Sequence, residues 1–318
     1  MIAKYLLVGI AVMALLGVTG DLLGWGEGEM LLENSIFRSE EARDRLMEIY
    51  DGLLAGWPIP YEELDVETGF GIVHVIASGP EDGRPILLFH ASGMSATSWR
   101  WNIETLSAYR TYAIDHIGEV NKSRLASTDS FPKTIEEITG LYAEIADRLG
   151  VERSAVIAGS NGGFIAMNYA IRYPERVSKL VLTGPMGLTK PKAAMAIRLL
   201  AAQFIHLNMV EQSTLDWVLG NAPSVREPYG EWFSVMMSGS FPHVVPPTGI
   251  AQEDLAKIEA PVLLFLGTTD NLVGDEEKAS RAASIIPDVR IEIVESSHLV
   301  NVEAAADVNE RMGGFLAE

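Results

Sequence analysis

AVIAGSNGGFIA, residues 155–166, runs from small and apolar residues through a glycine-flanked Ser-Asn pair into a second apolar run. This pattern predicts a buried strand, a tight turn and a helix, with Ser160 at the turn. One interpretation is that the Ser160 hydroxyl caps the helix. The other is a nucleophile elbow, a strained turn that lifts the serine oxygen above the sheet edge and tolerates only small residues two positions away. Ala158 and Gly162 are small, so both interpretations stay open.

Short, apolar, β-rich runs of the same kind recur from Pro85 onward, and most are separated by segments with helical spacing such as 134–150 and 275–286. Buried strands that alternate with helices predict an α/β fold, a mostly parallel central sheet flanked by helices. The runs are ILLF at 86–89, TYAI at 111–114, AVIA at 155–158, KLVLT at 179–183, VLLFL at 262–266 and RIEIV at 290–294. Upstream, 39–54 predicts a helix, and 63–68 with 71–79 predicts a hairpin.

The alternation stops between residues 186 and 248. This interval has helical spacing, several Trp, Met and Pro residues and no comparable strand. It predicts a helical cap inserted over the carboxyl edge of the sheet, where open α/β sheets bind ligands.

Composition excludes several functional classes. The 318 residues carry a net charge of −19, which argues against a nucleic-acid surface and disfavours anionic substrates. The chain has no cysteine, so disulfides, thiol nucleophiles and cysteine zinc sites are excluded. The six histidines have no metal-binding spacing, and we expect neither a metal nor a cofactor.

The N-terminal segment 1–24 differs from the rest of the chain. It is continuously apolar from Tyr5 to Gly20, which is typical of a signal-peptide core or a short anchor. Lys4 precedes the apolar run and acidic residues follow it, so the remaining chain is expected outside the cytoplasm, secreted or membrane-anchored. The alternative is a cytoplasmic protein whose N-terminal helix packs on its own domain or on a second copy.

Two further polar residues follow predicted strands. Asp270 comes directly after VLLFLGTT, and His298 directly after RIEIVESS. Because the carboxyl ends of parallel strands meet at one edge, these side chains are expected near Ser160 as orienting acid and general base. Taken singly, Asp270 could be a turn residue and His298 a packed histidine. Three such residues, in the order Ser, Asp, His, favour a catalytic triad.

The loop HASGMSATSW, residues 90–99, directly follows the strand ILLF. A loop at that place is expected to supply one oxyanion amide, from Ser92, while Asn161 supplies the other. His90 ends the strand and is expected to orient the loop. His116 is expected to line the edge of the site.

From about residue 36 to 318, the chain resembles the α/β-hydrolase superfamily, and more narrowly its bacterial serine carboxylesterases. The resemblance lies in WPIPYEE, GIVHVIASGPEDGRP, AIDHIGEVNKS, GSNGGF, GTTD and SSHLVNVE. It implies Ser160, Asp270 and His298 as the triad, with the backbone N–H groups of Ser92 and Asn161 as oxyanion donors. Two positions depart from the family pattern, since Ala91 and Ala158 stand where glycine is common.

These observations predict a serine hydrolase that cleaves small, neutral carboxylic esters with short or medium acyl chains through an acyl-enzyme. Two alternatives remain at this stage. One is another reaction on the same triad, such as C–C bond hydrolysis, perhydrolysis or amide hydrolysis. The other is a non-catalytic ligand-binding relative that keeps the fold.

Overall fold

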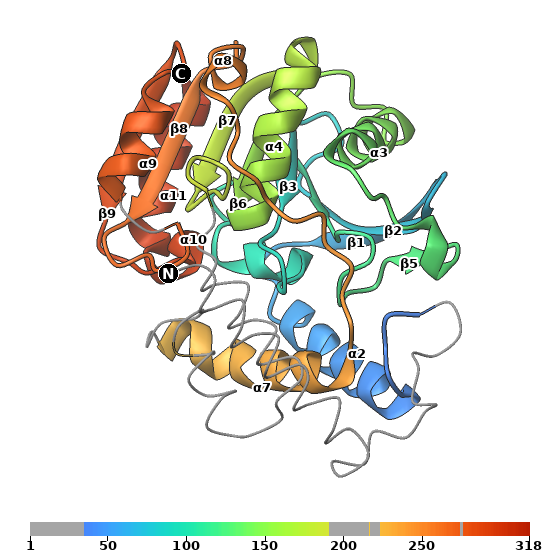
Figure 1. The fold of residues 1–318 in the computed structure, drawn as a ribbon. Coiled ribbons are helices and arrows are strands. Elements are labelled where there is room, and N and C mark those ends of the chain that lie inside the picture. The colour runs from blue at the N-terminus through green and yellow to red at the C-terminus, as the bar shows by residue number, and fades with distance from the viewer. Residues whose placement is uncertain (1–34, 191–215, 217–222, 274–275) are drawn as a thin grey trace, which may run out of the picture.

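The computed structural model describes residues 35–190, 216, 223–273 and 276–318. At its centre is a twisted sheet flanked by helices (Figure 1), whose strands lie in the order β1-β2-β4-β3-β6-β7-β8-β9, with β5 paired to β2. The strands are β1 Tyr61–Thr68, β2 Gly71–Ser78, β3 Pro85–Phe89, β4 Arg110–Ile114, β5 Arg124–Leu125, β6 Ser154–Gly159, β7 Val177–Thr183, β8 Val262–Gly267 and β9 Val289–Val294. Every run predicted as a strand is a strand, and the predicted hairpin is the antiparallel pair β1–β2.

The path of the chain through the sheet places two loops side by side. From β4 to β9 neighbouring strands are parallel, but β3 pairs with β4 on one side and with β6 on the other. The connection that leaves β3 for β4 and the connection that leaves β6 for β7 therefore run in opposite directions across the sheet. Open α/β sheets bind ligands at such a switch point, outside the carboxyl ends of the strands. The loops after β3 and β6 carry Ser92 and Ser160, so both residues lie at the switch point.

Helices cover both faces of the sheet. They are α2 Glu40–Leu54, α3 Ile135–Arg148, α4 Ser160–Arg172, α7 Pro223–Gly239, α8 Gln252–Leu255, α9 Glu276–Ala283, α10 Val300–Glu303 and α11 Ala305–Ala317, with short 3-10 turns η1 Ala96–Trp101, η2 Thr128–Ser130 and η3 Pro174–Arg176. Two of the long helices have the start signals that their sequences predict. The Ser39 hydroxyl accepts a hydrogen bond from the Ala42 amide, and Thr134 forms a capping box with Glu137.

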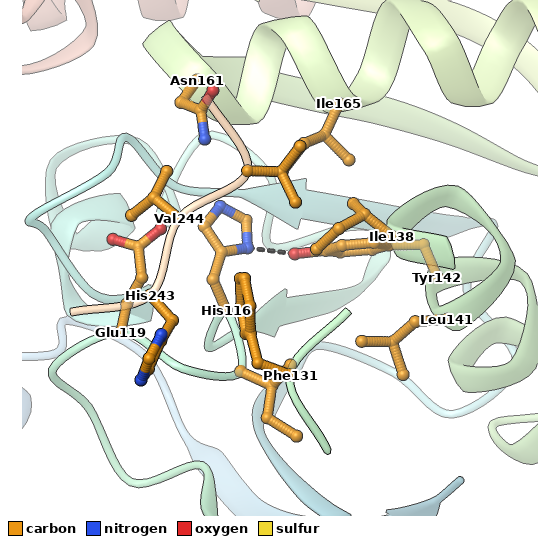
Figure 2. A pocket seen from close by; sticks show the side chains of 12 residues that line it. His116, Glu119, Phe131, Ile138, Leu141, Tyr142, Asn161, Ile165, His243 and Val244 are labelled. Atoms are coloured by element: carbon orange, nitrogen blue, oxygen red, sulfur yellow. Dashed lines mark hydrogen bonds between the residues drawn. The ribbon is translucent and has the colours of Figure 1, made fainter. Parts of the chain in front are cut away.

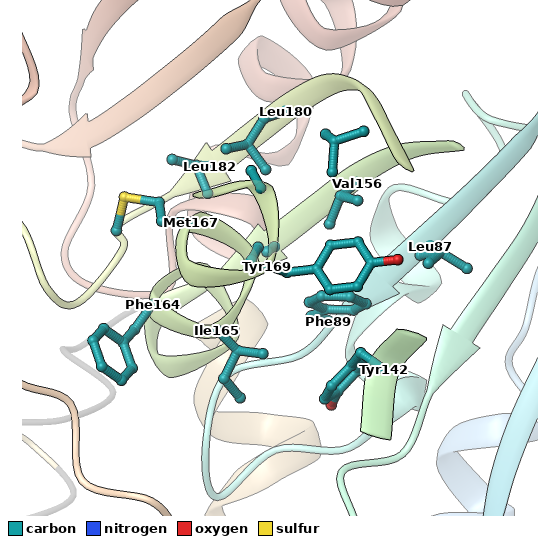
Figure 3. Close-up of a cluster of buried hydrophobic side chains, with 14 of the residues drawn as sticks. Leu87, Phe89, Tyr142, Val156, Phe164, Ile165, Met167, Tyr169, Leu180 and Leu182 are labelled. Carbon is teal, nitrogen blue, oxygen red and sulfur yellow. The ribbon is translucent and has the colours of Figure 1, made fainter. Parts of the chain in front are cut away.

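Alternation along β6 divides the apolar side chains between two cores. Val156 and Ala158 face the core beneath α3, α4 and α9, whereas Ala155 and Ile157 face the core beneath α2, η1 and α11. Figure 3 shows the first core, where α4 lies against β3, β6 and β7 through side chains such as Phe89. Burial of each large apolar side chain contributes about 1.5–3 kcal/mol. This packing fixes α4, and hence the turn that precedes it.

Two predicted segments fall wholly or partly outside the described residues. Within the interval 186–248, the described part contains α7, which packs against α2 (Figure 1). The N-terminal segment 1–24 lies outside the described residues, so its export or anchoring stays a prediction. Among the helices that the structure describes, none is long and apolar enough to cross a membrane.

A buried carboxylate joins four elements beneath the site. Oδ2 of Asp115, which follows β4, accepts hydrogen bonds from Tyr50 of α2 at 2.8 Å and from Nδ1 of His74 in β2 at 2.9 Å. Oδ1 accepts from the Ala96 amide of η1 at 2.8 Å. Nε2 of His74 also lies 3.0 Å from a Glu63 carboxylate oxygen, so both ring nitrogens donate to acids and the ring is an imidazolium.

Asp115 and His74 are both charged, and the Asp115 carboxylate therefore contributes to the stability of the fold. Burial raises the pKa of Asp115, but the hydrogen bond and the charge of His74 outweigh burial and hold that pKa below its ordinary value. The carboxylate therefore contributes stability above the unfolded-state pKa of 3.8, and this contribution is lost as the pH falls through the folded-state pKa.

We expect Asp115→Asn to lower the free energy of unfolding by about 3 kcal/mol at pH 7, because one buried acceptor becomes a donor facing other donors. Urea denaturation followed by circular dichroism measures the loss. The control is Asp65→Asn, which removes an exposed partner of Arg124 and should cost less than about 0.5 kcal/mol. The difference between the two variants should shrink below about pH 4. Equal losses in both variants would contradict the prediction.

Candidate active site

Ser160 stands on a strained turn between β6 and α4. Its φ is +49°, and it is the one non-glycine residue with positive φ in the described part of the chain. Such strain persists only where the surroundings impose it. The residue at the N-cap position of α4 is Gly159, and no side chain caps this helix. The capping interpretation of Ser160 is therefore wrong, and the turn has the geometry of a nucleophile elbow.

Gly162 shows why the elbow needs small residues. A Cβ atom at this position would lie 2.5 Å from the carbonyl oxygens of both Phe89 and His90, at the end of β3. No side chain fits there unless the backbone of β3 moves. The absence of a side chain lets the first turn of α4 approach the loop that follows β3.

The structure brings the three predicted triad residues together. Nδ1 of His298 lies 2.8 Å from Oδ2 of Asp270, and its Nε2 lies 2.7 Å from Oγ of Ser160. Because a carboxylate only accepts, Nδ1 carries a proton and donates it to Asp270, and Nε2 of the neutral ring accepts from the serine hydroxyl. Ser160 is 9% exposed and His298 is 4% exposed, so the serine oxygen lies at the base of a largely covered site.

Asp270 is held as a carboxylate. Its Oδ1 accepts hydrogen bonds from the amides of Leu272 at 2.8 Å and Val273 at 2.9 Å, which leaves Oδ2 for His298. Burial raises the pKa of Asp270, but His298 and the two amides outweigh burial and lower that pKa below its ordinary value. Asp270 therefore stabilises the turn through Oδ1 and contacts His298 through Oδ2, so its two proposed roles are compatible.

The first turn of α4 leaves backbone donors free for an anion. The first amides of any helix have no intrahelical acceptor, and here no capping side chain takes their place. Asn161 belongs to this turn and directly follows the nucleophile. Among the described residues, the Ser92 amide has no acceptor and the Asn161 amide lies in a helix turn whose amides lack intrahelical acceptors, and both oxyanion roles stay predictions.

His90 and His116 stack beneath the loop that follows β3, with ring centroids 3.8 Å apart. His90 donates from Nδ1 to the Ala91 carbonyl and accepts at Nε2 from the His116 amide, as expected for a residue that orients the loop. His116 donates from Nε2 to the His90 carbonyl and accepts from the Tyr142 hydroxyl (Figure 2). Burial lowers the pKa of both histidines, so both are neutral.

A small pocket, partly open to solvent, adjoins the nucleophile through Asn161. Figure 2 shows its wall, which is mostly apolar. The lining residues are His116, Ile117, Glu119, Phe131, Ile138, Leu141, Tyr142, Asn161, Ile165, His243, Val244 and Val245. His116 thus lines the site, as predicted.

Sequence reasoning missed Glu119, a buried carboxylate in this wall. Burial raises the pKa of Glu119 to about 7, although hydrogen bonds from Gly93 and Ser92 lower it. Its only sequence signal is an acidic residue three positions past a strand-end loop histidine in AIDHIGEVNKS, which does not distinguish a site residue from a surface residue.

Comparisons with known proteins agree with this geometry. The family model described as the alpha/beta hydrolase fold matches residues 84–305. An uncharacterized carboxylesterase of Bacillus subtilis, nap, is 30% identical over 289 residues, which cover 85% of this chain and 92% of that protein. Carboxylesterase YbfK of the same organism is 30% identical over 309 residues, which cover 90% and 98%.

A solved structure adds a likeness in three dimensions. The crystal structure of naproxen esterase (carboxylesterase NP) from Bacillus subtilis matches with a TM-score of 0.80 at 29% identity, covering 87% of this chain and 99% of that chain. The family match spans more than half of the chain, and the parallel sheet, the elbow and the Ser–His–Asp contacts accompany it. On these grounds, the chain belongs to the α/β-hydrolase family.

Proposed function

We propose that this chain is a serine carboxylesterase, which hydrolyses carboxylic esters to an acid and an alcohol. The observation that carries the proposal is the hydrogen-bonded series from Asp270 through His298 to Ser160, with Ser160 on the strained turn. Sequence relatives named as carboxylesterases along nearly the whole chain support the same reaction class.

Acylation starts at the serine hydroxyl. Oγ of Ser160 attacks the ester carbonyl carbon while its proton passes to Nε2 of His298, which lies 2.7 Å away. The carbonyl oxygen becomes an oxyanion, and the proposed donors to it are the amides of Ser92 and Asn161. Asp270 stabilises the imidazolium that forms and fixes the ring orientation. Collapse of the intermediate breaks the bond to the leaving alkoxide, which takes the proton back from His298.

Deacylation repeats the same steps with water. His298 removes a proton from water, the hydroxide attacks the acyl-enzyme carbonyl, and the serine oxygen leaves with the proton that His298 returns. The net reaction consumes one ester and one water and yields one acid and one alcohol.

The proposed function is tested with a matched set of substrates. The purified full chain is assayed on p-nitrophenyl butyrate, the corresponding anilide and a C–C diketone. Preferred turnover of the ester supports the proposal. Faster hydrolysis of the anilide or the diketone would assign a different reaction to the triad, and no turnover of any substrate would favour a binding protein.

We expect neutral esters of short or medium acyl chains to be the preferred substrates, because the pocket beside Asn161 is small and mostly apolar and Glu119 adds negative charge to its wall. Each added methylene should raise kcat/KM up to about fourfold, the equivalent of 0.8 kcal/mol, until the pocket is full. A p-nitrophenyl ester series from acetate to palmitate measures this limit.

A matched pair of substrates tests whether the site discriminates against an anionic acyl chain. Mono-p-nitrophenyl succinate differs from p-nitrophenyl butyrate chiefly by a carboxylate at the end of the acyl chain. We expect kcat/KM for the succinate to be at least about tenfold lower, because a second charge would be buried near Glu119 in a protein of net charge −19. Equal or faster hydrolysis of the succinate would contradict the prediction.

A further inference from the structure

Glu119 is a buried carboxylate that belongs to no part of the triad. It is 4% exposed, and both of its oxygens accept hydrogen bonds from the loop that follows β3. Oε1 accepts from the Ser92 hydroxyl at 2.9 Å, and Oε2 accepts from the Gly93 amide at 2.7 Å. A buried charge is costly unless it is hydrogen-bonded, and these two donors offset part of that cost. With a pKa of about 7, the carboxylate is ionised at pH 8.

The same hydroxyl connects Glu119 to the residue after the nucleophile. While Oγ of Ser92 donates to Glu119, it accepts from Nδ2 of Asn161 at 3.1 Å. The series Glu119–Ser92–Asn161 therefore ties together the two residues whose amides are expected to bind the oxyanion. One of them lies on the loop after β3 and the other on α4, and no element of secondary structure joins them.

The two peptide groups that flank the Cα of Gly93 are each held by a hydrogen bond. Gly93 has φ of +78°, its N–H donates to Glu119, and its carbonyl accepts from Nε1 of the fully buried Trp232 in α7 at 2.8 Å. The Ser92 amide, one residue earlier, has no acceptor within the described protein. The hydrogen bonds of Gly93 thus fix the orientation of the neighbouring Ser92 N–H, which itself stays free to donate.

We propose that Glu119 is a positioning residue of the oxyanion hole: its carboxylate orients the Ser92 amide through the loop and, through the Ser92 hydroxyl, holds Asn161 of α4 in register with it. The inference rests on the proposed function, because it concerns the same reaction. Two acceptor oxygens are required here, since Ser92 and Gly93 both donate. A glutamine would turn an amide group toward one of these donors.

The central test is Glu119→Gln, which keeps the shape of the side chain and removes one acceptor. We expect kcat for p-nitrophenyl butyrate at pH 8 to fall about 10- to 100-fold with KM changed less than about twofold, because misplaced oxyanion donors affect the transition state. The second readout is the rate at which a fluorophosphonate labels Ser160, which should fall by a similar factor. The labelling transition state uses the same donors but needs no ester turnover.

Two further variants sharpen the comparison. Ser92→Ala keeps the backbone amide and breaks the link to Asn161, so labelling should slow by a smaller factor, about three- to tenfold. Glu62→Gln removes the same charge from Glu62 of β1, which pairs with Arg110 of β4, and should leave both rates unchanged. Circular dichroism verifies the folding of each variant, and Ser92→Ala decides the matter if Glu119→Gln does not fold.

The outcomes separate the inference from the proposed function. Unchanged labelling rates in folded Glu119→Gln or in Ser92→Ala would overturn the positioning role, as would a loss confined to KM. If wild type is labelled at Ser160 but hydrolyses no ester, the proposed function fails while slower labelling of the variants still supports the positioning role. If wild type is neither labelled nor active, both are overturned.

Discussion

Ser160→Ala should fold normally and lose about 10⁴- to 10⁶-fold in kcat on p-nitrophenyl butyrate, because it removes the one oxygen that can form the acyl-enzyme. Among the residues that the structure describes, the hydroxyl makes one side-chain hydrogen bond, to His298 at 2.7 Å. Loss of that contact leaves Nε2 of His298 in a partly open site, where water can replace the serine. The change in stability should therefore be small, within about 1 kcal/mol.

The measurement combines turnover with site identification. A fluorophosphonate should label wild type at Ser160 alone, as peptide mass spectrometry would establish, and should not label Ser160→Ala. The matched control is Ser154→Ala, a buried serine at the opposite end of β6, which should keep wild-type turnover. Undiminished turnover in folded Ser160→Ala, or labelling at another residue, would refute the role assigned to the elbow.

The sequence predicted the triad because each of its members follows a parallel strand, fully buried in β6 and β8 and mostly half-buried in β9. A parallel strand flanked by helices has an unmistakable apolar composition, and the rule that carboxyl ends meet at one edge then converts positions in the chain into proximity. Ser160, Asp270 and His298 could therefore be placed together before any coordinates were known. The strand order β4-β3-β6 could not be read in the same way, because it depends on the direction taken by each crossover connection.

No pattern in the sequence predicted the contacts that hold the loop after β3, which carries Ser92 and Gly93. Trp232 donates to the Gly93 carbonyl across 139 residues of chain, and Glu119, in the loop after β4, accepts from the N–H of the same residue. Neither residue belongs to a local pattern, since a tryptophan in an apolar interval and an acid beside a glycine have many ordinary roles. Their function follows only from tertiary packing, which brings α7 and the loop after β4 onto the loop after β3.

Asp115 illustrates the same limit within the core. Its position after β4 made it resemble Asp270, which also follows a strand, yet its partners are Tyr50, His74 and Ala96 rather than the nucleophile. A strand-end acid is predicted to lie at the carboxyl edge, and it does. Which residues its side chain meets, His74 among them, depends on the register of β2 against β4, a tertiary property.

Asp270→Asn is expected to lower kcat about 10⁴-fold while keeping the fold. The amide oxygen can still accept from Leu272 and Val273, so the turn keeps its hydrogen bonds. The amide nitrogen then faces Nδ1 of His298 and donates to it. Because a neutral imidazole carries one ring proton, that proton must move to Nε2, where it meets the Ser160 hydroxyl instead of accepting from it.

The tautomer itself can be measured, which separates this mechanism from a general loss of structure. In protein labelled with ¹⁵N-histidine, the His298 proton should reside on Nδ1 in wild type and on Nε2 in the variant. The control Asp254→Asn removes an exposed charge that pairs with Lys257, and it should change neither the tautomer nor kcat. A folded Asp270→Asn variant that retains more than about a tenth of wild-type kcat would mean that His298 finds its orientation elsewhere. Since the described residues place no other carboxylate within hydrogen-bonding distance of that ring, the full loss is the expected result.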